Sequence, residues 1–143
     1  MCSSDLRARG DEKNAEAALR SALKLSPRNA SVHHALGLAL VRQKRMGEAV
    51  AELREAARLA PGHPRYVYVV GIALHSTGKR AEGIKLLADA QRRFTGDADI
   101  LQALAVMERD RGNRDAARVY ARKLGELSPD DPQAQGLLRE LER

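Results

Sequence analysis

Residues 30–63 read ASVHHALGLALVRQKRMGEAVAELREAARLAPGH, and the pattern in this stretch decides the fold. Its first half places apolar residues at the spacing of one helical face. A short polar segment around Lys44 interrupts the pattern, and a second amphipathic stretch follows as far as Pro61. Because the residue before a proline disfavours helix, the second helix should end before Pro61. The stretch therefore predicts two helices, 30–44 and 47–59, joined by a tight turn.

The same pattern returns with a period of 34 residues along most of the chain. Prolines, glycines, other small residues and leucines each fall into columns at this interval or at twice this interval, which indicates an internal repeat. Small residues in a column allow two helices to approach closely, whereas larger side chains would hold them apart. The columns include Pro27 and Pro61; Gly10, Gly78 and Gly112; Gly37 and Gly71; Ala49, Gly83 and Ala117; and Leu19, Leu53 and Leu87.

Each period predicts two antiparallel helices, because the turns that join them are short. No such hairpin covers its own apolar face, so burial is completed only when hairpins stack on each other. We therefore expect an all-α fold, a right-handed α-solenoid of antiparallel helix hairpins. The expected helices are 12–25, 30–44, 47–59, 64–77, 80–93, 98–111, 114–127 and 131–142.

The pattern resembles the tetratricopeptide repeat (TPR), a 34-residue motif of two helices. Residues 30–63 carry the resemblance best, with the motif's residues at Leu36-Gly37, Ala49, Ala56 and Pro61. The aromatic positions of the motif are mostly occupied by other residues, including Glu108. The resemblance implies a single TPR-like domain over 1–143, with repeats at 30–63, 64–97 and 98–131, a truncated first repeat at 1–29 and a capping helix at 132–143.

The N-terminal stretch departs from the repeat, since residues 1–29 hold a complete second helix but only a stub of the first. Residues 1–6 resemble a translated sequencing adapter. We hypothesise that they are a non-native leader and that the natural protein extends further upstream. The incomplete repeat should leave one apolar face of helix 12–25 poorly covered, which could support self-association. This face consists of Ala15, Ala18, Leu19 and Ala22.

Composition excludes several classes of protein. The net charge is +6, but acidic residues are interleaved with basic ones and only 3% of the residues are aromatic, which argues against nucleic-acid binding. No apolar run approaches the roughly 20 residues of a membrane span, so we expect no membrane partner. The single Cys2 excludes an intrachain disulfide. We expect a soluble bacterial protein of the cytoplasm or periplasm; the sequence does not distinguish the two compartments.

Motifs for catalysis, cofactors and metals fail in their details. Residues 73–80 superficially resemble a phosphate-binding loop, but Ala73 and Arg80 stand where Gly and Ser or Thr are required. The adjacent His33 and His34 would point about 100° apart on a helix, and no closely spaced Cys/His set accompanies the four histidines. No haem-attachment motif occurs either. We therefore predict no enzyme activity, no cofactor and no metal site.

A binding surface is the remaining candidate, because the TPR resemblance implies that the first helix of each repeat lines a concave groove. A column of apolar residues would form its floor, and arginines would line its rim. Such a groove fits a peptide or partner protein with apolar anchors and some acidic character. Alternatively, the floor residues pack against the next hairpin. The predicted groove residues are His34, Leu38, Arg42, Arg65, Tyr68, Ile72, His75, Gln102, Val106 and Arg109.

The family's known grip on a terminal carboxylate is not expected, because Leu38, Ile72 and Val106 occupy the positions of its asparagine. The sequence therefore favours a non-catalytic protein-interaction scaffold. Two alternatives stay open. In one, the chain is the C-terminal docking arm of a larger bacterial enzyme or multihaem cytochrome. In the other, a basic face binds RNA or DNA.

Overall fold

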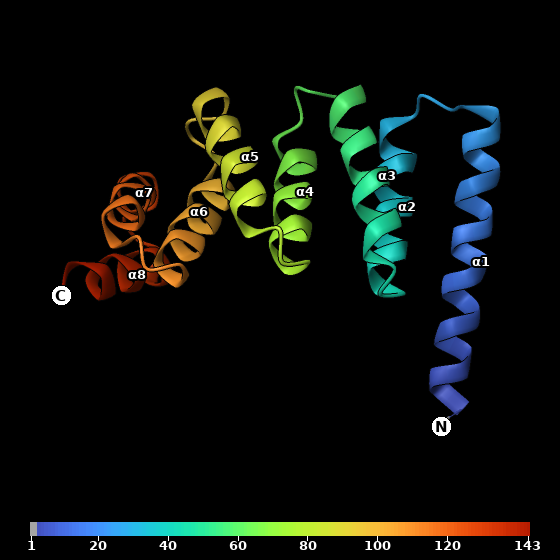
Figure 1. Cartoon of the computed structure of the whole chain (residues 1–143), viewed down its shortest axis with the longest axis horizontal. Coiled ribbons are helices and arrows are strands. Elements are labelled where there is room, and N and C mark those ends of the chain that lie inside the picture. The colour runs from blue at the N-terminus through green and yellow to red at the C-terminus, as the bar shows by residue number, and fades with distance from the viewer. Residues whose placement is uncertain (1–2) are drawn as a thin grey trace. The chain divides into compact units, whose positions relative to one another are not determined.

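The computed structural model describes residues 3–143, with side chains from Leu6 onward, and over these residues it contains helices and no strands (Figure 1). Except for the first, the helices begin and end within two residues of the expected positions, which confirms the all-α fold. The helices are α1 (Ser3–Leu25), α2 (Ala30–Arg42), α3 (Met46–Leu59), α4 (Pro64–Ser76), α5 (Arg80–Arg93), α6 (Ala98–Asp110), α7 (Arg114–Leu127) and α8 (Pro132–Glu142).

The chain divides into two compact units, which we describe separately. The N-terminal unit extends to Ala73 and the C-terminal unit begins at Leu74, so the division falls within α4. Within the N-terminal unit, α1, α2 and α3 follow one another, and α2 and α3 form a hairpin (Figure 1). Within the C-terminal unit, α6 and α7 form the equivalent hairpin, and α8 packs on α7.

Side chains ahead of several helices bind the free backbone N–H groups of the first turn, which fixes where these helices begin. Asn29 accepts from the backbone N–H of Val32 ahead of α2. Asp97 accepts from the N–H of Ile100 ahead of α6, and Asp131 does the same for α8. Asn29, Asp97 and Asp131 belong to one column of the 34-residue repeat. The repeat therefore encodes helix starts as well as apolar faces.

The turn between the two helices of a hairpin requires a left-handed residue. Lys44, Gly78 and Gly112, which share one column, have φ values of 60°, 86° and 89°. Glycine adopts this conformation without steric penalty, whereas the Cβ of Lys44 lies close to a backbone carbonyl oxygen and strains the turn. Gly10 belongs to the same column but does not form a turn.

Helix α1 corrects the expected boundary at residue 12. It starts at Ser3, passes through Gly10 and has 23 residues, against 14 in each of α3, α5 and α7. Continuing α1 through Gly10 satisfies the backbone hydrogen bonds of this segment within the helix.

The core of the N-terminal unit joins three helices. Leu36 and Leu40 of α2 and Ala49 of α3 are fully buried, and Leu19 of α1 packs against them together with Leu23 and Val41. The α1 face that was expected to be poorly covered is only partly covered. Ala18 is exposed, Ala15, Leu19 and Ala22 are half-buried, and Leu19 packs against the cluster of α2 and α3.

Gly37 of α2 lies close to Leu53 of α3. A Cβ atom added to Gly37 would lie 2.6 Å from the Leu53 side chain and 3.3 Å from the backbone oxygen of Ala49. Leu53 is fully buried and has little room to shift. The small-residue column is thus explained at Gly37 by the space between α2 and α3.

The core of the C-terminal unit includes two clusters that both involve α7. Ala105, Ala117 and Ala121 pack with Leu137 and Leu141 of α8. A second cluster contains Leu101, Leu124 and Ala134, and the side chain of Tyr120 packs against both clusters. Arginines of α7 also bind the C-terminal end of α8, where carbonyl groups lack helical partners. Arg118 Nε donates to the Leu141 oxygen over 2.7 Å, and Arg114 donates to the Glu140 and Leu141 oxygens.

Candidate functional site

The ten predicted groove residues are shared between the two units. In the N-terminal unit, α2 and α4 carry six of them, of which two arginines are exposed and the others half-buried. The C-terminal unit carries the other four, of which only Gln102 is exposed. The six are His34, Leu38, Arg42, Arg65, Tyr68 and Ile72, and the four are His75, Gln102, Val106 and Arg109.

Aromatic rings bring α2 and α4 together beside these residues. The ring of His34 lies 4.6 Å from the ring of Tyr66, which in turn stacks on His63 at 5.0 Å. The guanidinium of Arg65 lies 5.4 Å from the centre of the Tyr68 ring, within the range of a cation–π contact. Burial and the charge of Arg65 lower the pKa of His34, so the ring is neutral at pH 7. Sequence analysis missed Tyr66, although it stands on the same helix as Arg65 and Tyr68.

Two of the predicted rim arginines, Arg42 and Arg109, are engaged in ion pairs within the chain. Arg42 Nε lies 2.7 Å from Glu12 Oε1 of α1. Arg109 contacts Asp110 at 2.9 Å and Glu140 of α8 at 3.3 Å. These carboxylates partly neutralise the arginines that were expected to recognise an acidic partner. The two pairs span 30 and 31 residues, which differs from the 34-residue repeat, so periodicity did not indicate them.

A second carboxylate of α1 supports the same region. Glu16 accepts hydrogen bonds from Arg20, from Gln43 at 3.0 Å and from Arg45 at 2.7 Å. The hydrogen bond from Gln43, together with those from Arg20 and Arg45, holds the pKa of Glu16 below its usual value. Because Gln43 and Arg45 flank the turn after α2, Glu16 ties this turn to α1.

The predicted apolar floor is neither fully exposed nor fully buried. Leu38, Ile72 and Val106 are all half-buried, whereas the neighbouring Leu36 and Leu104 are completely inaccessible. Val106 packs against the cluster of α7 and α8 in the C-terminal unit. Each of the three side chains keeps part of its surface available for a partner.

Two polar groups outside the predicted groove are held by internal partners. Glu108, at an aromatic position of the motif, is only 4% exposed. Its two oxygens accept from Arg111 at 2.6 and 3.0 Å. His33 also points away from the groove residues and binds Glu52 and the backbone oxygen of Pro27. We therefore assign Glu108 and His33 to stabilisation of the fold.

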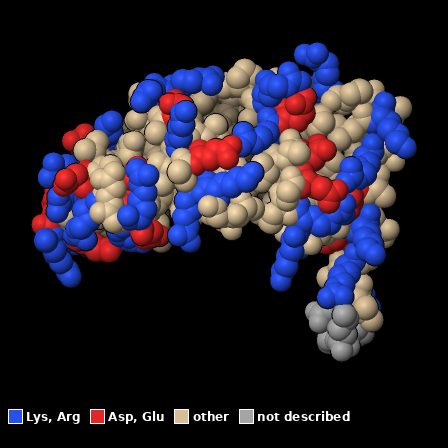
Figure 2. Space-filling model, viewed as in Figure 1, with Lys and Arg blue, Asp and Glu red and all other residues tan. Residues whose placement is uncertain are grey.

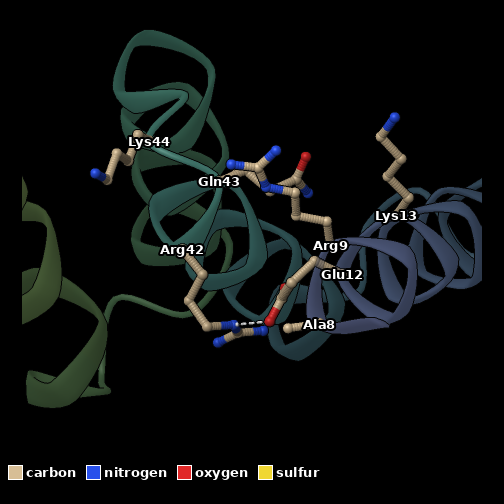
Figure 3. Close-up of a pocket in the computed structure, with 7 residues that line it drawn as sticks. All are labelled: Ala8, Arg9, Glu12, Lys13, Arg42, Gln43 and Lys44. Carbon is tan, nitrogen blue, oxygen red and sulfur yellow. Dashed lines mark hydrogen bonds and ion pairs between the residues drawn. The ribbon is translucent and has the colours of Figure 1, made fainter. Parts of the chain in front are cut away.

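A pocket of about 580 Å³ lies in the N-terminal unit, between α1 and the end of α2 (Figure 3). Sequence analysis did not predict it, because it depends on the straight path of α1 past Gly10. Of the groove residues, only Arg42 contributes to it. The lining residues are Ala8, Arg9, Glu12, Lys13, Arg42, Gln43 and Lys44.

Metal-ligand clusters and membrane spans were sought among the described residues. No three His, Cys, Asp or Glu side chains come together as metal ligands within the described part of the chain. Cys2 and Met1 of the suspected leader lie outside the described residues. Between Ser3 and Arg143, none of the helices has the length and apolar character of a membrane span.

Comparison with known proteins identifies the repeat. Residues 3–64 match the family model described as tetratricopeptide repeat. No curated protein matches the sequence.

Several solved structures share the fold at low sequence identity. MamA is 23% identical with a TM-score of 0.78, over 99% of this chain and 90% of that one. A tetratricopeptide repeat protein from Parabacteroides merdae is 16% identical with a TM-score of 0.82, over 97% of this chain and 57% of that one. One chain in the structure of the APC/C hetero-tetramer Cut9–Hcn1 is 18% identical with a TM-score of 0.77, over 96% of this chain and 28% of that one. The resemblance to the tetratricopeptide repeat family is thus confirmed, by the family model over residues 3–64 and by the fold of the described chain.

Proposed function

We propose that this chain is a non-catalytic scaffold that binds a peptide or partner protein through the first helices of its repeats. Tetratricopeptide repeats generally mediate protein–protein interaction, and one structure of the same fold is a hetero-tetramer. In the N-terminal unit the binding face consists of the six groove residues of α2 and α4, and in the C-terminal unit of the other four.

The observation that carries the proposal is the partial exposure of the apolar column. Leu38, Ile72 and Val106 recur at 34-residue intervals and remain half-buried, beside leucines that are completely buried. A partner that covers these side chains gains the free energy of removing apolar surface from water, about 25 cal/mol per Å². Within the N-terminal unit, Leu38 and Ile72 suit two apolar anchors of an extended chain or a helix, and Val106 offers a further anchor on the C-terminal unit.

The aromatic and basic side chains beside this column favour amphipathic anchors. Arg65 and Tyr68 combine a charge with a ring face, and His34 adds a neutral ring that contacts Tyr66 in a tilted arrangement. Because Arg42 already pairs with Glu12, an acidic partner would have to compete for it. Apolar anchoring therefore contributes more of the affinity than ion pairing on this face.

The test compares two double variants in a pull-down with cross-linking and mass spectrometry. Leu38→Asp/Ile72→Asp places two charges on the proposed face. Val119→Asp/Leu127→Asp places the same charges on α7, where these apolar side chains are 49% and 48% exposed. We expect the first variant to lose the cross-linked partners and the second to keep them.

Circular dichroism melts establish that both variants are folded. A folded Leu38→Asp/Ile72→Asp variant that recovers the same partners with the same cross-links as wild type would contradict the proposal.

A further inference from the structure

The pocket between α1 and the end of α2 is strongly basic. Four of its seven lining residues are cationic, and Glu12 is the only acidic one. In the view of Figure 2, Lys and Arg side chains cover the N-terminal part of α1. The cationic residues are Arg9, Lys13, Arg42 and Lys44.

Glu12 offsets only part of this charge. Its Oε1 lies 2.7 Å from Arg42 Nε, and the carboxylate thereby balances that guanidinium (Figure 3). Lys13 and Lys44 are exposed and extend on opposite sides of the central Arg9 and Gln43 in the same view. In this view the Lys44 ammonium points away from Arg9 and Gln43, so the two ammonium groups lie at opposite edges of the pocket.

The pocket arises where the structure departs from the repeat. If the chain turned at Gly10 as it does at Gly78 and Gly112, Ala8 and Arg9 would not continue the helix beside the end of α2. Lys44 occupies the left-handed position of the turn at the opposite wall. All lining residues follow the first six residues of the chain.

We propose that this pocket binds an acidic peptide segment, whose side-chain carboxylates pair with Lys13 and Lys44. The site lies beyond the face assigned under the proposed function and shares only Arg42 with it. Its volume falls within the range of about 300–1,000 Å³ that is usual for ligand sites. A flexible peptide can place several carboxylates against cations on both walls, which adds charge-assisted hydrogen bonds of about 2.7–2.9 Å.

A peptide suits the lining better than a nucleic acid does. Single-stranded RNA and DNA are usually held by aromatic side chains on which the bases stack. The seven lining residues include no aromatic side chain. The lining instead offers carboxylate partners and the apolar stems of lysine and arginine side chains.

The test measures fluorescence anisotropy of a labelled hexaglutamate peptide with the full chain at low ionic strength. The variant Lys13→Gln/Lys44→Asn removes two charges from the pocket, and asparagine tolerates the left-handed conformation at residue 44. The matched control Lys85→Gln/Lys123→Gln removes two charges from exposed positions of the C-terminal unit. We expect at least tenfold weaker binding in the pocket variant, less than twofold in the control, and weakening by added salt.

A second measurement needs no variant. Acetylation of lysines in the wild-type chain is followed by mass spectrometry with and without hexaglutamate. We expect the peptide to protect Lys13 and Lys44 but not Lys85 or Lys123. Equal protection of all four lysines, or equal weakening in both double variants, would show attraction by net charge alone and overturn the proposal.

Two further probes separate this site from other modes of binding. A single-stranded RNA hexamer that binds more tightly than hexaglutamate would overturn the proposal in favour of a nucleic acid. The variant Leu38→Asp/Ile72→Asp should keep hexaglutamate binding within threefold of wild type, since it leaves the pocket intact. The peptide pocket and the groove of the proposed function can therefore fail independently.

Discussion

The imidazole of His33 is bound to the carboxylate of Glu52, with Nδ1 2.6 Å from Oε2. Its other nitrogen, Nε2, lies 2.7 Å from the backbone oxygen of Pro27. Both partners are acceptors, so both ring nitrogens must donate and the ring is an imidazolium ion. His33 thereby connects the α1–α2 loop, α2 and α3.

The protonation of His33 predicts a dependence of stability on pH. Burial of the ring favours the neutral form, but the hydrogen bonds to Glu52 and Pro27 and the charges of Glu52 and Glu55 outweigh it and raise the pKa of His33 above 6.5. The folded state therefore binds the proton more tightly than the unfolded state. The resulting stabilisation is fully present below about pH 6.5 and is lost as the pH rises through the folded-state pKa.

Urea unfolding between pH 5 and 9 measures this effect. We expect His33→Gln to lower the free energy of unfolding by about 1–3 kcal/mol at the acidic end, and by less at the alkaline end. The control is His63→Gln, because His63 is exposed in the loop before α4. A constant difference between wild type and His33→Gln across this pH range would refute the imidazolium.

Gly37 predicts the cost of filling the space between α2 and α3. We expect Gly37→Ala to destabilise the chain by about 1–3 kcal/mol, because its Cβ would overlap the buried Leu53 side chain. The larger Gly37→Leu should cost at least as much.

Gly136 of α8 provides the matched control for Gly37. No atom lies within 4 Å of a Cβ added there, so Gly136→Ala should stabilise α8 by about 0.5–1 kcal/mol. Thermal melts report both changes. A Gly37→Ala variant as stable as wild type would remove the argument for close approach.

The left-handed turn position predicts that adding glycine stabilises the chain and that removing glycine destabilises it. Lys44 has a φ of 60° and Gly112 a φ of 89°. Lys44→Gly removes left-handed strain of ~1–2 kcal/mol. Part of this gain is lost because glycine makes the unfolded chain more flexible, so we expect a net stabilisation of up to about 1 kcal/mol. Gly112→Ala should destabilise by about 1 kcal/mol.

Gly96 is the control for these two substitutions, because its φ is not positive and the space around it is open. Gly96→Ala should leave the melting temperature unchanged or slightly higher. If Gly96→Ala and Gly112→Ala had the same effect, the left-handed conformation would not be the cause.

The pair of Glu108 and Arg111 predicts an asymmetric result. Glu108 is 4% exposed, whereas the Arg111 side chain is 45% exposed. Arg111→Met should destabilise by about 1–3 kcal/mol, because it leaves a buried carboxylate without its partner. Glu108→Met should change stability by less than about 1 kcal/mol, because Arg111 can turn to water. Urea titrations of the two variants check the order, and a larger loss for Glu108→Met would contradict it.

Local signals explain why the helix boundaries could be predicted. Asn29, Asp97 and Asp131 cap helices through side chains two or three residues from the groups they bind. Gly78 and Gly112, which recur in one column of the repeat, adopt the left-handed conformation that glycine allows without steric penalty. Gly10 belongs to the same column, but α1 continues through it as one helix.

The side-chain pairs could not be predicted in the same way. Periodicity placed Arg42 and Arg109 on exposed faces but did not indicate that Glu12 and Glu140 would lie against them. Both pairs join residues of different helices, and their contact depends on how those helices are rotated about their axes.

The order of amino acids was sufficient for the number and length of the helices from α2 onward and for the hairpins α2–α3 and α6–α7, since capping, turn formation and amphipathic spacing act over a few neighbouring positions. Packing in three dimensions alone settled the straight course of α1, the charged state of His33 and the basic pocket beside Lys44. These features arise from groups that lie far apart along the chain and interact only after the helices have come together.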